Sequence, residues 1–385
     1  MGVAISQKAK NMPALDKYAS YEIENLCKTN LLRVIQDSEK QEGIYIKRNG
    51  KKIISFSCND YFDLSQHPKT IEASIKAIQR YGVGAGASRL ITGNNPLYNE
   101  LEKALAEYKK TEAACVFGSG YLANVGTISA LVAKGDLIVA DRLAHACMID
   151  GAKLSGATLK RFKHNDIDSL SAILSRERSK FKKCLIITET IFSMDGDFSP
   201  VKQIVARAKK YDCWTLTDDA HGFGITQPNN QVDIQLGTLS KGVGSYGGYI
   251  CAKKEVIDYI KNKARTLIYS TALPPATLAA SVAAIKIIQS ENERTLRPIE
   301  LSNLFADLVN LPRTNSPIFS LVLGSEASAL DLSEKLLDEG FLVSAIRPPT
   351  VQKNTSRLRI SFSYLHKPDY IRRLAKTINN MEKNS

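Results

Sequence analysis

The sequence predicts an α/β protein with a mostly parallel sheet covered by helices and a smaller C-terminal α/β domain. Between residues 110 and 255, short runs rich in Ile, Val and Leu alternate with segments of helical spacing, which is typical of a parallel sheet with helices on both faces. The composition changes after about residue 285, where a second set of strand and helix patterns begins. We therefore expect an N-terminal segment over residues 1–58, a large domain over 59–285 and a small domain over 286–385.

The N-terminal part predicts a helix, a hairpin and a second helix. Residues 14–40 have helical spacing and many charges. The stretch GIYIKRNGKKIISFSCNDY indicates a hairpin that turns at Asn49-Gly50, because this dipeptide is the strongest short hairpin signal. The stretch KTIEASIKAIQRYG indicates an amphipathic helix that stops at Gly82.

Strands and helices then alternate through the large domain. The predicted strands are AACVF, DLIVAD, KCLIITET, CWTLTDD, VDIQLGT and GGYICAK, and the predicted helices are YLANVGTISALVA and DFSPVKQIVARAKKYD. In the small domain, SPIFSLVLGS, KLLDEGFLVSAI and SRLRISFSYL indicate a strand, a helix, two further strands and a closing helix.

The composition is that of an ordinary soluble globular protein, with 44% apolar and 24% charged residues. The net charge of +13 has two interpretations, a polyanionic partner or a generally lysine-rich proteome. The second is favoured because no long block of like charges occurs, so we expect no nucleic-acid partner. The seven cysteines form no C-x-x-C pair, which argues against a metal site or a disulfide frame and favours free thiols in a reducing cytoplasm. No segment is suited to span a bilayer, so we expect a cytoplasmic protein without a membrane partner.

The residues after the predicted strands carry the chemistry, because ligands of open α/β sheets bind at the carboxyl ends of the strands. These segments are GSGYLAN, RLAHA, TIFSMDGD, DDAHGFG and LSKGVG. Together they place two histidines, several acids, hydroxyls and one lysine along one edge. The remaining histidines, at positions 67, 164 and 366, are expected in loops or on the surface.

Two of these segments leave alternatives open. The glycine turn of GSGYLAN leads into a helix, whose N-terminal N–H groups and dipole suit a phosphate, although a turn with nothing bound is equally consistent. Asp218 is the first polar residue past a buried strand and His221 follows three residues later. The two could form a structural ion pair or part of a metal site, for which the ligands are too few. They could also bind a ring, with the carboxylate on a protonated ring nitrogen.

The stretch GTLSKGVGSYGGYI contains both Lys241 and a G-x-G-x-x-G pattern. A dinucleotide-binding turn must open a helix, but these glycines lead into a predicted strand. The glycines instead indicate a flexible turn that lets the lysine move. A lysine here is most simply a surface charge, yet its neighbours form the set that a Schiff base with pyridoxal phosphate requires: a ring-binding acid, a histidine and a phosphate-binding turn.

The same segments, with DRLAHACMIDGAKLSGA and IYSTALPP, resemble the α-oxoamine synthases in one continuous order from about Asn59 to Arg359. These are fold-type I pyridoxal 5'-phosphate enzymes, transferases that condense an amino acid with an acyl thioester and release carbon dioxide. The stretches RFKHND and IRPPTV with SRLRISFS are most similar to the branch that acts in biotin biosynthesis. The resemblance therefore implies an acyltransferase that uses L-alanine and a pimeloyl thioester, carried by coenzyme A or by an acyl carrier protein.

The resemblance also implies a role for each site residue. Lys241 forms the Schiff base and removes the Cα proton, Asp218 pairs with the pyridinium nitrogen, and His221 bonds the ring's phenolic oxygen. Arg359 binds the amino-acid carboxylate, a bidentate task suited to arginine. The resemblance further implies that His145 stacks on the ring, that Thr238, Gly120 and Tyr121 bind the phosphate, and that Ser193 makes another cofactor contact. It implies a homodimer in which Thr271 contacts the phosphate held by the partner subunit. The implied substrate contacts are Asn59, His145 and Thr350.

Two other classes of function stay open at this point. Sister α-oxoamine synthases that make 5-aminolevulinate, 2-amino-3-ketobutyrate or 3-ketosphinganine share most of these motifs, and aminotransferases share the fold. A non-catalytic homologue is the third possibility, and the intact set of Lys241, Asp218, His221 and His145 argues against it. The segments 222–240 and 290–317 are shorter than is usual for the family.

Overall fold

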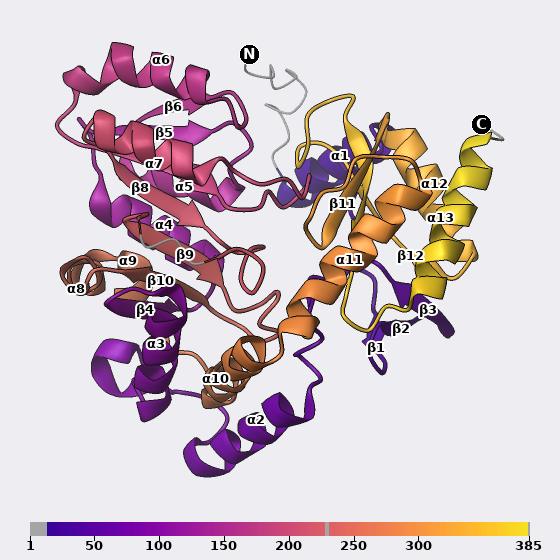
Figure 1. Cartoon of the computed structure of the whole chain (residues 1–385), viewed down its shortest axis with the longest axis horizontal. Coiled ribbons are helices and arrows are strands. Elements are labelled where there is room, and N and C mark those ends of the chain that lie inside the picture. Colours follow the sequence, from indigo (N-terminus) through magenta and orange to yellow (C-terminus); the bar gives the residue numbers. More distant parts are fainter. Residues whose placement is uncertain (1–13, 228–230, 384–385) are drawn as a thin grey trace.

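The computed structural model describes residues 14–227 and 231–383. It has a large part built on a seven-stranded sheet and a smaller part built on two short sheets (Figure 1). The helix predicted over 14–40 is shorter than expected, because α1 spans only Leu15–Lys28 and Asn30 adopts a left-handed conformation after it. Among the described residues, no helix is long and apolar enough to cross a membrane.

The large sheet has the strand order β4-β10-β9-β8-β7-β5-β6. Its pairs among β5 to β9 are all parallel, and β10 is antiparallel to both β4 and β9. The mostly parallel sheet is therefore confirmed, with β6 as a strand that the sequence did not reveal. The strands are β4 (Ala113–Phe117), β5 (Leu137–Asp141), β6 (Thr158–Phe162), β7 (Cys184–Glu189), β8 (Trp214–Asp218), β9 (Ile234–Thr238) and β10 (Gly248–Ala252).

Helices cover both faces of this sheet because alternate residues of its buried strands point to opposite sides. In β7, Ile186 packs with the helices α6 and α7, whereas Leu185 and Ile187 pack with α4, α5 and α8. These helices are α4 (Gly120–Leu131), α5 (Ala146–Ser155), α6 (Ile167–Glu177), α7 (Val201–Lys210) and α8 (Lys254–Lys263), and the short α9 spans Arg265–Ile268.

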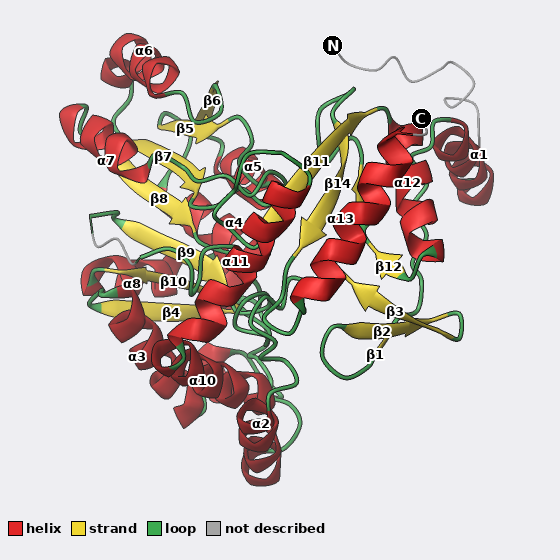
Figure 2. Cartoon of the chain, turned by 45° about the vertical axis from the view of Figure 1, so that its right-hand side comes forward, coloured by secondary structure: helices red, strands yellow, loops and turns green. Residues whose placement is uncertain are grey.

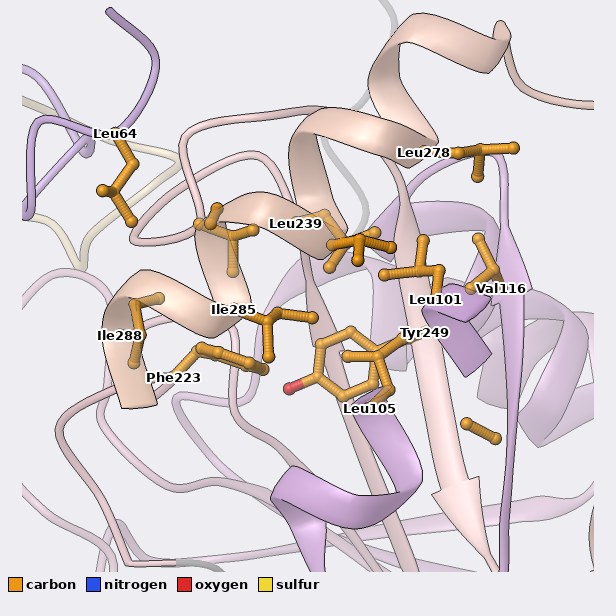
Figure 3. Close-up of a cluster of buried hydrophobic side chains, with 14 of the residues drawn as sticks. Leu64, Leu101, Leu105, Val116, Phe223, Leu239, Tyr249, Leu278, Ile285 and Ile288 are labelled. Carbon is orange, nitrogen blue, oxygen red and sulfur yellow. The ribbon is translucent and has the colours of Figure 1, made fainter. Parts of the chain in front are cut away.

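A further apolar cluster joins the β4–β10 end of the sheet to α3 (Pro96–Lys109) and α10 (Pro275–Ser290), and α2 (Pro68–Tyr81) packs against α10. Figure 3 shows Tyr249 of β10 at its centre, between Leu105 of α3 and Ile285 of α10. Helix α2 ends where the sequence predicts, before Gly82.

The small part consists of a three-stranded sheet of order β11-β14-β13, a four-stranded sheet of order β1-β2-β3-β12, and the helices α11, α12 and α13 (Figure 2). The predicted hairpin is confirmed and turns at Asn49-Gly50, and its second strand pairs in parallel with β12, so that Ile54 lies opposite Phe341. The N-terminal segment thus packs on the C-terminal part, although the division into three domains stays a prediction. The elements are β1 (Glu39–Lys40), β2 (Tyr45–Arg48), β3 (Lys51–Ser55), α11 (Asn292–Leu308), β11 (Ile318–Gly324), α12 (Glu326–Asp338), β12 (Phe341–Leu342), β13 (Ser344–Ile346), β14 (Ser356–Ser361) and α13 (Pro368–Lys383).

Candidate active site

The carboxyl ends of the parallel strands bring the predicted residues to one edge of the large sheet. Glu189 ends β7, Asp218 ends β8 and Thr238 ends β9, and Glu189 lies directly opposite Asp218 in the strand register. Lys241 follows Thr238 by one short turn. The expectation that acids, hydroxyls and the lysine share one edge is therefore confirmed by the topology.

Asp218 is a buried carboxylate with neutral partners. Its two oxygens accept hydrogen bonds from the Asn124 side chain at 2.7 Å and from the Ala220 backbone at 2.9 Å. Burial raises the pKa of Asp218, while the Lys241 ammonium and the Asn124 amide oppose that rise. A buried carboxylate stays ionised only where a cation or strong donors face it, so this position suits a cationic ring nitrogen.

His221 connects Lys241 to the substrate side of the site. Its Nε2 lies 2.7 Å from Lys241 Nζ and its Nδ1 lies 2.7 Å from the Tyr61 hydroxyl. Burial, followed by the charges of Lys241 and Arg359, holds the pKa of His221 well below its usual value. The neutral ring therefore accepts at Nε2 from the Lys241 ammonium and donates from Nδ1 to Tyr61, whose own hydroxyl donates to the Asn59 side-chain oxygen Oδ1 at 3.2 Å.

Lys241 is not an ordinary surface lysine. Burial lowers its pKa, and the carboxylates of Asp218 and then Glu189 only partly offset that effect. A lysine with a lowered pKa has more of the neutral amine that acts as a nucleophile and as a base. Because its Nζ also lies against the buried His221, the alternative of a solvated surface charge does not apply.

The expectation of a flexible glycine turn after Lys241 is wrong. A methyl group on Gly242 would lie 2.9 Å from the Phe62 ring, and one on Gly244 would lie 2.5 Å from the Ser65 backbone nitrogen. The glycines permit close packing of this turn against residues 62–65, so the turn is held in place. Its rigidity fixes the point from which the Lys241 side chain extends.

The glycine turn before α4 lies against the end of β9. A methyl group on Gly120 would come within 3.0 Å of Thr238 Cβ, so only glycine permits this approach. The first N–H groups of a helix have no partner within the helix, and here they lie beside the Thr238 hydroxyl. Such a cradle suits a phosphate. The Tyr121 side chain turns away to donate to Asp150 at 2.8 Å, which leaves its backbone N–H for this role.

A cavity of 1040 Å³ adjoins these residues and is lined by His145, Ser193 and Thr350. His145 begins α5, where its Nδ1 accepts from the Cys147 backbone at 3.2 Å. Desolvation lowers the pKa of His145 and the Asp218 carboxylate opposes this change. Lys241, Asp218 and His221 are not among the residues that line this cavity.

Arg359 is a buried guanidinium without a carboxylate partner among the described residues. It lies in β14 and donates to the Ser193 backbone oxygen at 2.6 Å, to Ser361 at 2.8 Å and to the Tyr61 hydroxyl at 3.3 Å. Arg357, two residues earlier on the strand, forms an ion pair with Asp195. An unpaired buried cation is costly, so Arg359 is arranged for an anion that comes from outside.

The structure does not bring Thr271 to these residues. Thr271 is exposed and forms a bridge with Ser88, so its role toward a partner subunit stays a prediction. The other histidines, at positions 67, 164 and 366, lie in loops as expected, but two of them are not free in solvent. His366 is buried and stacks on Phe56 at a centroid distance of 4.1 Å, and His164 is half-buried between two carboxylates.

Three residues of the site were missed in the sequence, namely Tyr61, Asn124 and Glu189. Burial raises the pKa of Glu189 to about 8, helped by the Asp218 charge, and its Oε1 has no partner among the described residues. Glu189 is the last residue of its strand and Asn124 lies within the glycine segment GSGYLAN, so position alone could have identified both. No local signal marks Tyr61.

These residues fit pyridoxal phosphate. The Gly120–Thr238 cradle matches a phosphate, the buried Asp218 matches a protonated ring nitrogen, and Lys241 offers an amine of lowered pKa. The Glu189 Oε1 atom at the same place is buried without a hydrogen-bond partner among the described residues, as expected where a ligand supplies the missing polar group. Among the described residues, no group of three or more metal-ligating side chains is gathered.

Comparisons with known proteins agree with this geometry. The family model for class I and II aminotransferases matches residues 51–378. The chain is 46% identical over 369 residues to the 8-amino-7-oxononanoate synthase of Methylobacterium nodulans, which covers 96% of this chain and 97% of that protein. It is 43% identical over 377 residues to the enzyme of that name from Beijerinckia indica, covering 95% of this chain and 98% of that protein.

Two solved structures have the same fold. A serine palmitoyltransferase of S. paucimobilis, with bound PLP–myriocin aldimine, has a TM-score of 0.90 and 26% identity and covers 97% of this chain and 99% of its own. The 8-amino-7-oxononanoate synthase of Francisella tularensis has a TM-score of 0.74 and 28% identity and covers 86% of this chain and 98% of its own.

Proposed function

The chain belongs to the class I and II aminotransferase family, among the pyridoxal-phosphate-dependent α-oxoamine synthases, and we propose that it makes 8-amino-7-oxononanoate for biotin biosynthesis. In this reaction L-alanine and a pimeloyl thioester give the product, carbon dioxide and a free thiol. The observation that carries the proposal is the placement of Lys241 between His221 and the buried Asp218, with an unpaired Arg359 joined to His221 through Tyr61.

Pyridoxal phosphate, when bound, supplies an electron sink for the bonding pair released at the amino-acid Cα. The protein would hold it by Lys241 at the aldehyde carbon, Asp218 at the ring nitrogen and the Gly120–Thr238 cradle at the phosphate. His221 would donate to or accept from the ring oxygen through Nε2, and His145 would cover one face.

The protein's own residues would then bind the amino acid and move its proton. Arg359 would bind the carboxylate as a fork of two N–H groups, held in orientation by its bonds to Ser193 and Ser361. Lys241 would remove the Cα proton, because its lowered pKa leaves part of the amine neutral. Asn59 and Thr350 would contact the substrates at the mouth of the site.

The basic side chains that line the cavity favour an anionic acyl carrier. Three of the side chains that line it are exposed bases, Arg142, Lys153 and Arg161. The acids that line it are Asp150, which lies 3.8 Å from Lys153, and Asp195, which is paired with Arg357. Coenzyme A and the prosthetic arm of an acyl carrier protein both bring phosphate to such a wall. Replacing Arg142 and Arg161 with Gln is expected to raise KM for both pimeloyl thioesters and to leave KM for alanine unchanged. An unchanged KM for both carriers would remove this part of the proposal.

A homodimer is proposed from the surface around Thr271. Large apolar side chains near it are exposed in the single chain, including Leu90, Ile91 and Tyr269, as expected of an interface. The test is subunit mixing. Lys241→Ala and Thr271→Ala each impair every site of their own homodimer. A heterodimer of the two variants regains one intact site if Thr271 acts across the interface, and regains none if it acts within its own subunit.

The function itself is tested with purified protein. Wild type is expected to absorb visible light, to lose that absorption on borohydride reduction while the cofactor becomes permanently attached, and to release thiol from pimeloyl-coenzyme A when alanine is present. Lys241→Ala is expected to lose the covalent link, whereas Lys254→Ala, an exposed lysine on α8, keeps it. A colourless wild type that takes up no cofactor would refute the proposal.

The similarity to serine palmitoyltransferase makes a serine-using reaction the second candidate. The identity of 46% to proteins named 8-amino-7-oxononanoate synthase favours alanine. Thiol release measured with alanine, glycine and serine against short and long acyl thioesters separates the two. A preference for serine with a long acyl chain would assign the protein to the sister reaction.

A further inference from the structure

His164 lies outside the chemistry described above, yet three loops of the site meet at its ring. Its Nδ1 lies 3.0 Å from Asp141 at the end of β5, and its Nε2 lies 2.8 Å from Asp197 in the loop after β7. The ring also packs edge-on against Phe192 at a centroid distance of 4.4 Å. His164 itself belongs to the turn between β6 and α6.

The residue after His164 repeats this bridge. Asn165 adopts a left-handed conformation, with a φ of 54°, which lets two consecutive residues face the same carboxylates. Its backbone N–H donates to Asp141 at 3.0 Å, and its side-chain amide donates to Asp197 at 2.7 Å. Four polar contacts therefore join Asp141 to Asp197 through two residues.

The loop held by this bridge is the one that carries Ser193. Residues 191–198 form a tight hairpin, closed by the bridge between Ile191 and Phe198 and by the hydrogen bond from the Phe192 N–H to the Asp197 oxygen at 3.0 Å. The Ser193 backbone oxygen at its tip accepts from Arg359 at 2.6 Å. We call residues 191–198 the Ser193 hairpin.

The other anchor of the bridge leads to His145. Asp141 is fully buried, and its carboxylate accepts from the Leu143 N–H at 2.8 Å. That bond shapes the turn that ends at His145. The Ser193 hairpin and the turn before His145, which follow different strands, are thus joined through His164.

We propose that His164 is a positioning residue, a protonated bridge that holds the Ser193 hairpin against the end of β5 and so fixes Arg359 and His145 relative to one another. Two carboxylates facing one ring favour the imidazolium form. Although desolvation acts in the opposite direction, Asp141 and Asp197 together raise the pKa of His164 to about 10.

The direct test is hydrogen exchange of the Ser193 hairpin in the holoenzyme. His164→Asn is expected to reduce protection of residues 191–198 by on the order of tenfold, since local opening is governed by the bonds that hold the segment. The matched control is His67→Asn, because His67 caps α2 through its side chain and Asn is a good replacement at such a position. Equal protection of the hairpin in both variants would overturn the proposal.

Kinetics separate positioning from general destabilisation. Through Arg359, and resting on the proposed function, His164→Asn is expected to raise KM for alanine roughly tenfold, because small displacements of a binding group cost affinity steeply. KM for the acyl thioester should change much less. A lower thermal midpoint with both KM values unchanged would mean a purely structural role and would contradict the inference. The exchange data stand even if alanine is not the substrate.

Two further measurements examine the bridge itself. Once His164 is replaced, Asp197→Asn should have little additional effect on hairpin exchange, whereas additive effects would show that the two residues act independently. A raised pKa gives stabilisation that is complete below pH 6.5 and is lost as the pH rises through about 10. The difference in unfolding free energy between wild type and His164→Asn should therefore shrink across that window, and a constant difference would contradict a charged bridge.

Discussion

Tyr61→Phe removes a single hydroxyl on which three parts of the site depend. That oxygen accepts from His221 Nδ1 at 2.7 Å and from Arg359 Nη2 at 3.3 Å, and it donates to Asn59 at 3.2 Å. Tyr61 is 1% exposed, so water cannot replace the lost partner without opening the site. Phenylalanine keeps the ring in the core cluster formed with Phe62 and leaves the packing unchanged.

The expected cost follows from the bonds lost. The short bond to His221 contributes about 1 kcal/mol and the two longer bonds about 0.5 kcal/mol each. The Nδ1–H of His221 is then buried without a partner, which costs about another 1 kcal/mol or more. We therefore expect a loss of about 3 kcal/mol in the free energy of unfolding, although the removed atom is only one oxygen.

Urea unfolding of the cofactor-saturated protein measures this loss as a shift of midpoint at constant slope. The control is Tyr45→Phe, since the Tyr45 hydroxyl is part-buried and has one partner, Tyr370, at 2.7 Å. Water can reach that position, so a loss of about 1 kcal/mol or less is expected there. A loss for Tyr61→Phe no greater than for the control would refute the reasoning that the hydroxyl satisfies both His221 and Arg359.

Three other perturbations have defined outcomes. Arg359→Lys should raise KM for the amino acid by about 10- to 100-fold, because lysine cannot make the forked contact, whereas Arg357→Lys should leave it within about threefold. His366 is neutral because burial lowers its pKa to about 3. Between pH 6.5 and 3 the unfolded chain therefore binds a proton that the folded chain excludes, so the unfolding free energy falls as the pH drops through that window. His366→Gln should reduce this dependence of the unfolding free energy on pH. Gly244→Ala should lower the free energy of unfolding, measured with urea, by about 3 kcal/mol, since φ is 69° and the methyl would meet a backbone atom at 2.5 Å. The control Gly340→Ala has a φ of 85° but open space around the methyl, so it should cost about 1 kcal/mol.

Sequence patterns predicted the large sheet well because they report burial along one strand at a time. A strand such as CLIITE is buried throughout and mostly apolar because both of its faces are covered, and the run of apolar residues is visible in the local sequence. The residues that follow such strands meet at one edge by topology alone, which is why Asp218 and Thr238 could be placed. The π-helical turn at Arg89–Gly93 has no comparable periodic signal and was not anticipated.

What the sequence could not give is contact between distant segments. Tyr61 meets His221 and Arg359, which lie 160 and 298 positions away. His164 lies in a loop, as the sequence suggests, but its partners Asp141, at the end of β5, and Asp197, in the loop after β7, are 23 and 33 positions away. The glycines after Lys241 appeared flexible because the chain at Phe62 that packs against them is remote in sequence. In each case the role of the residue depends on a contact with a segment remote in sequence, and the local sequence gives no signal of that contact.

The charges buried at the strand edge explain why the site suits anionic ligands. Lys241 and Arg359 bring two bases. Of the two carboxyl groups that act on Lys241, Asp218 has partners that favour its ionised form, whereas the raised pKa of Glu189, about 8, keeps that side chain protonated near neutrality. Arg357 faces the same choice two residues away and takes Asp195 as its partner, which makes it a structural bridge between loops. The hydrogen-bond acceptors of Arg359 are all neutral oxygens. The negative charge that balances it must therefore arrive with a ligand, and a carboxylate next to the Lys241 amine is what an amino acid provides.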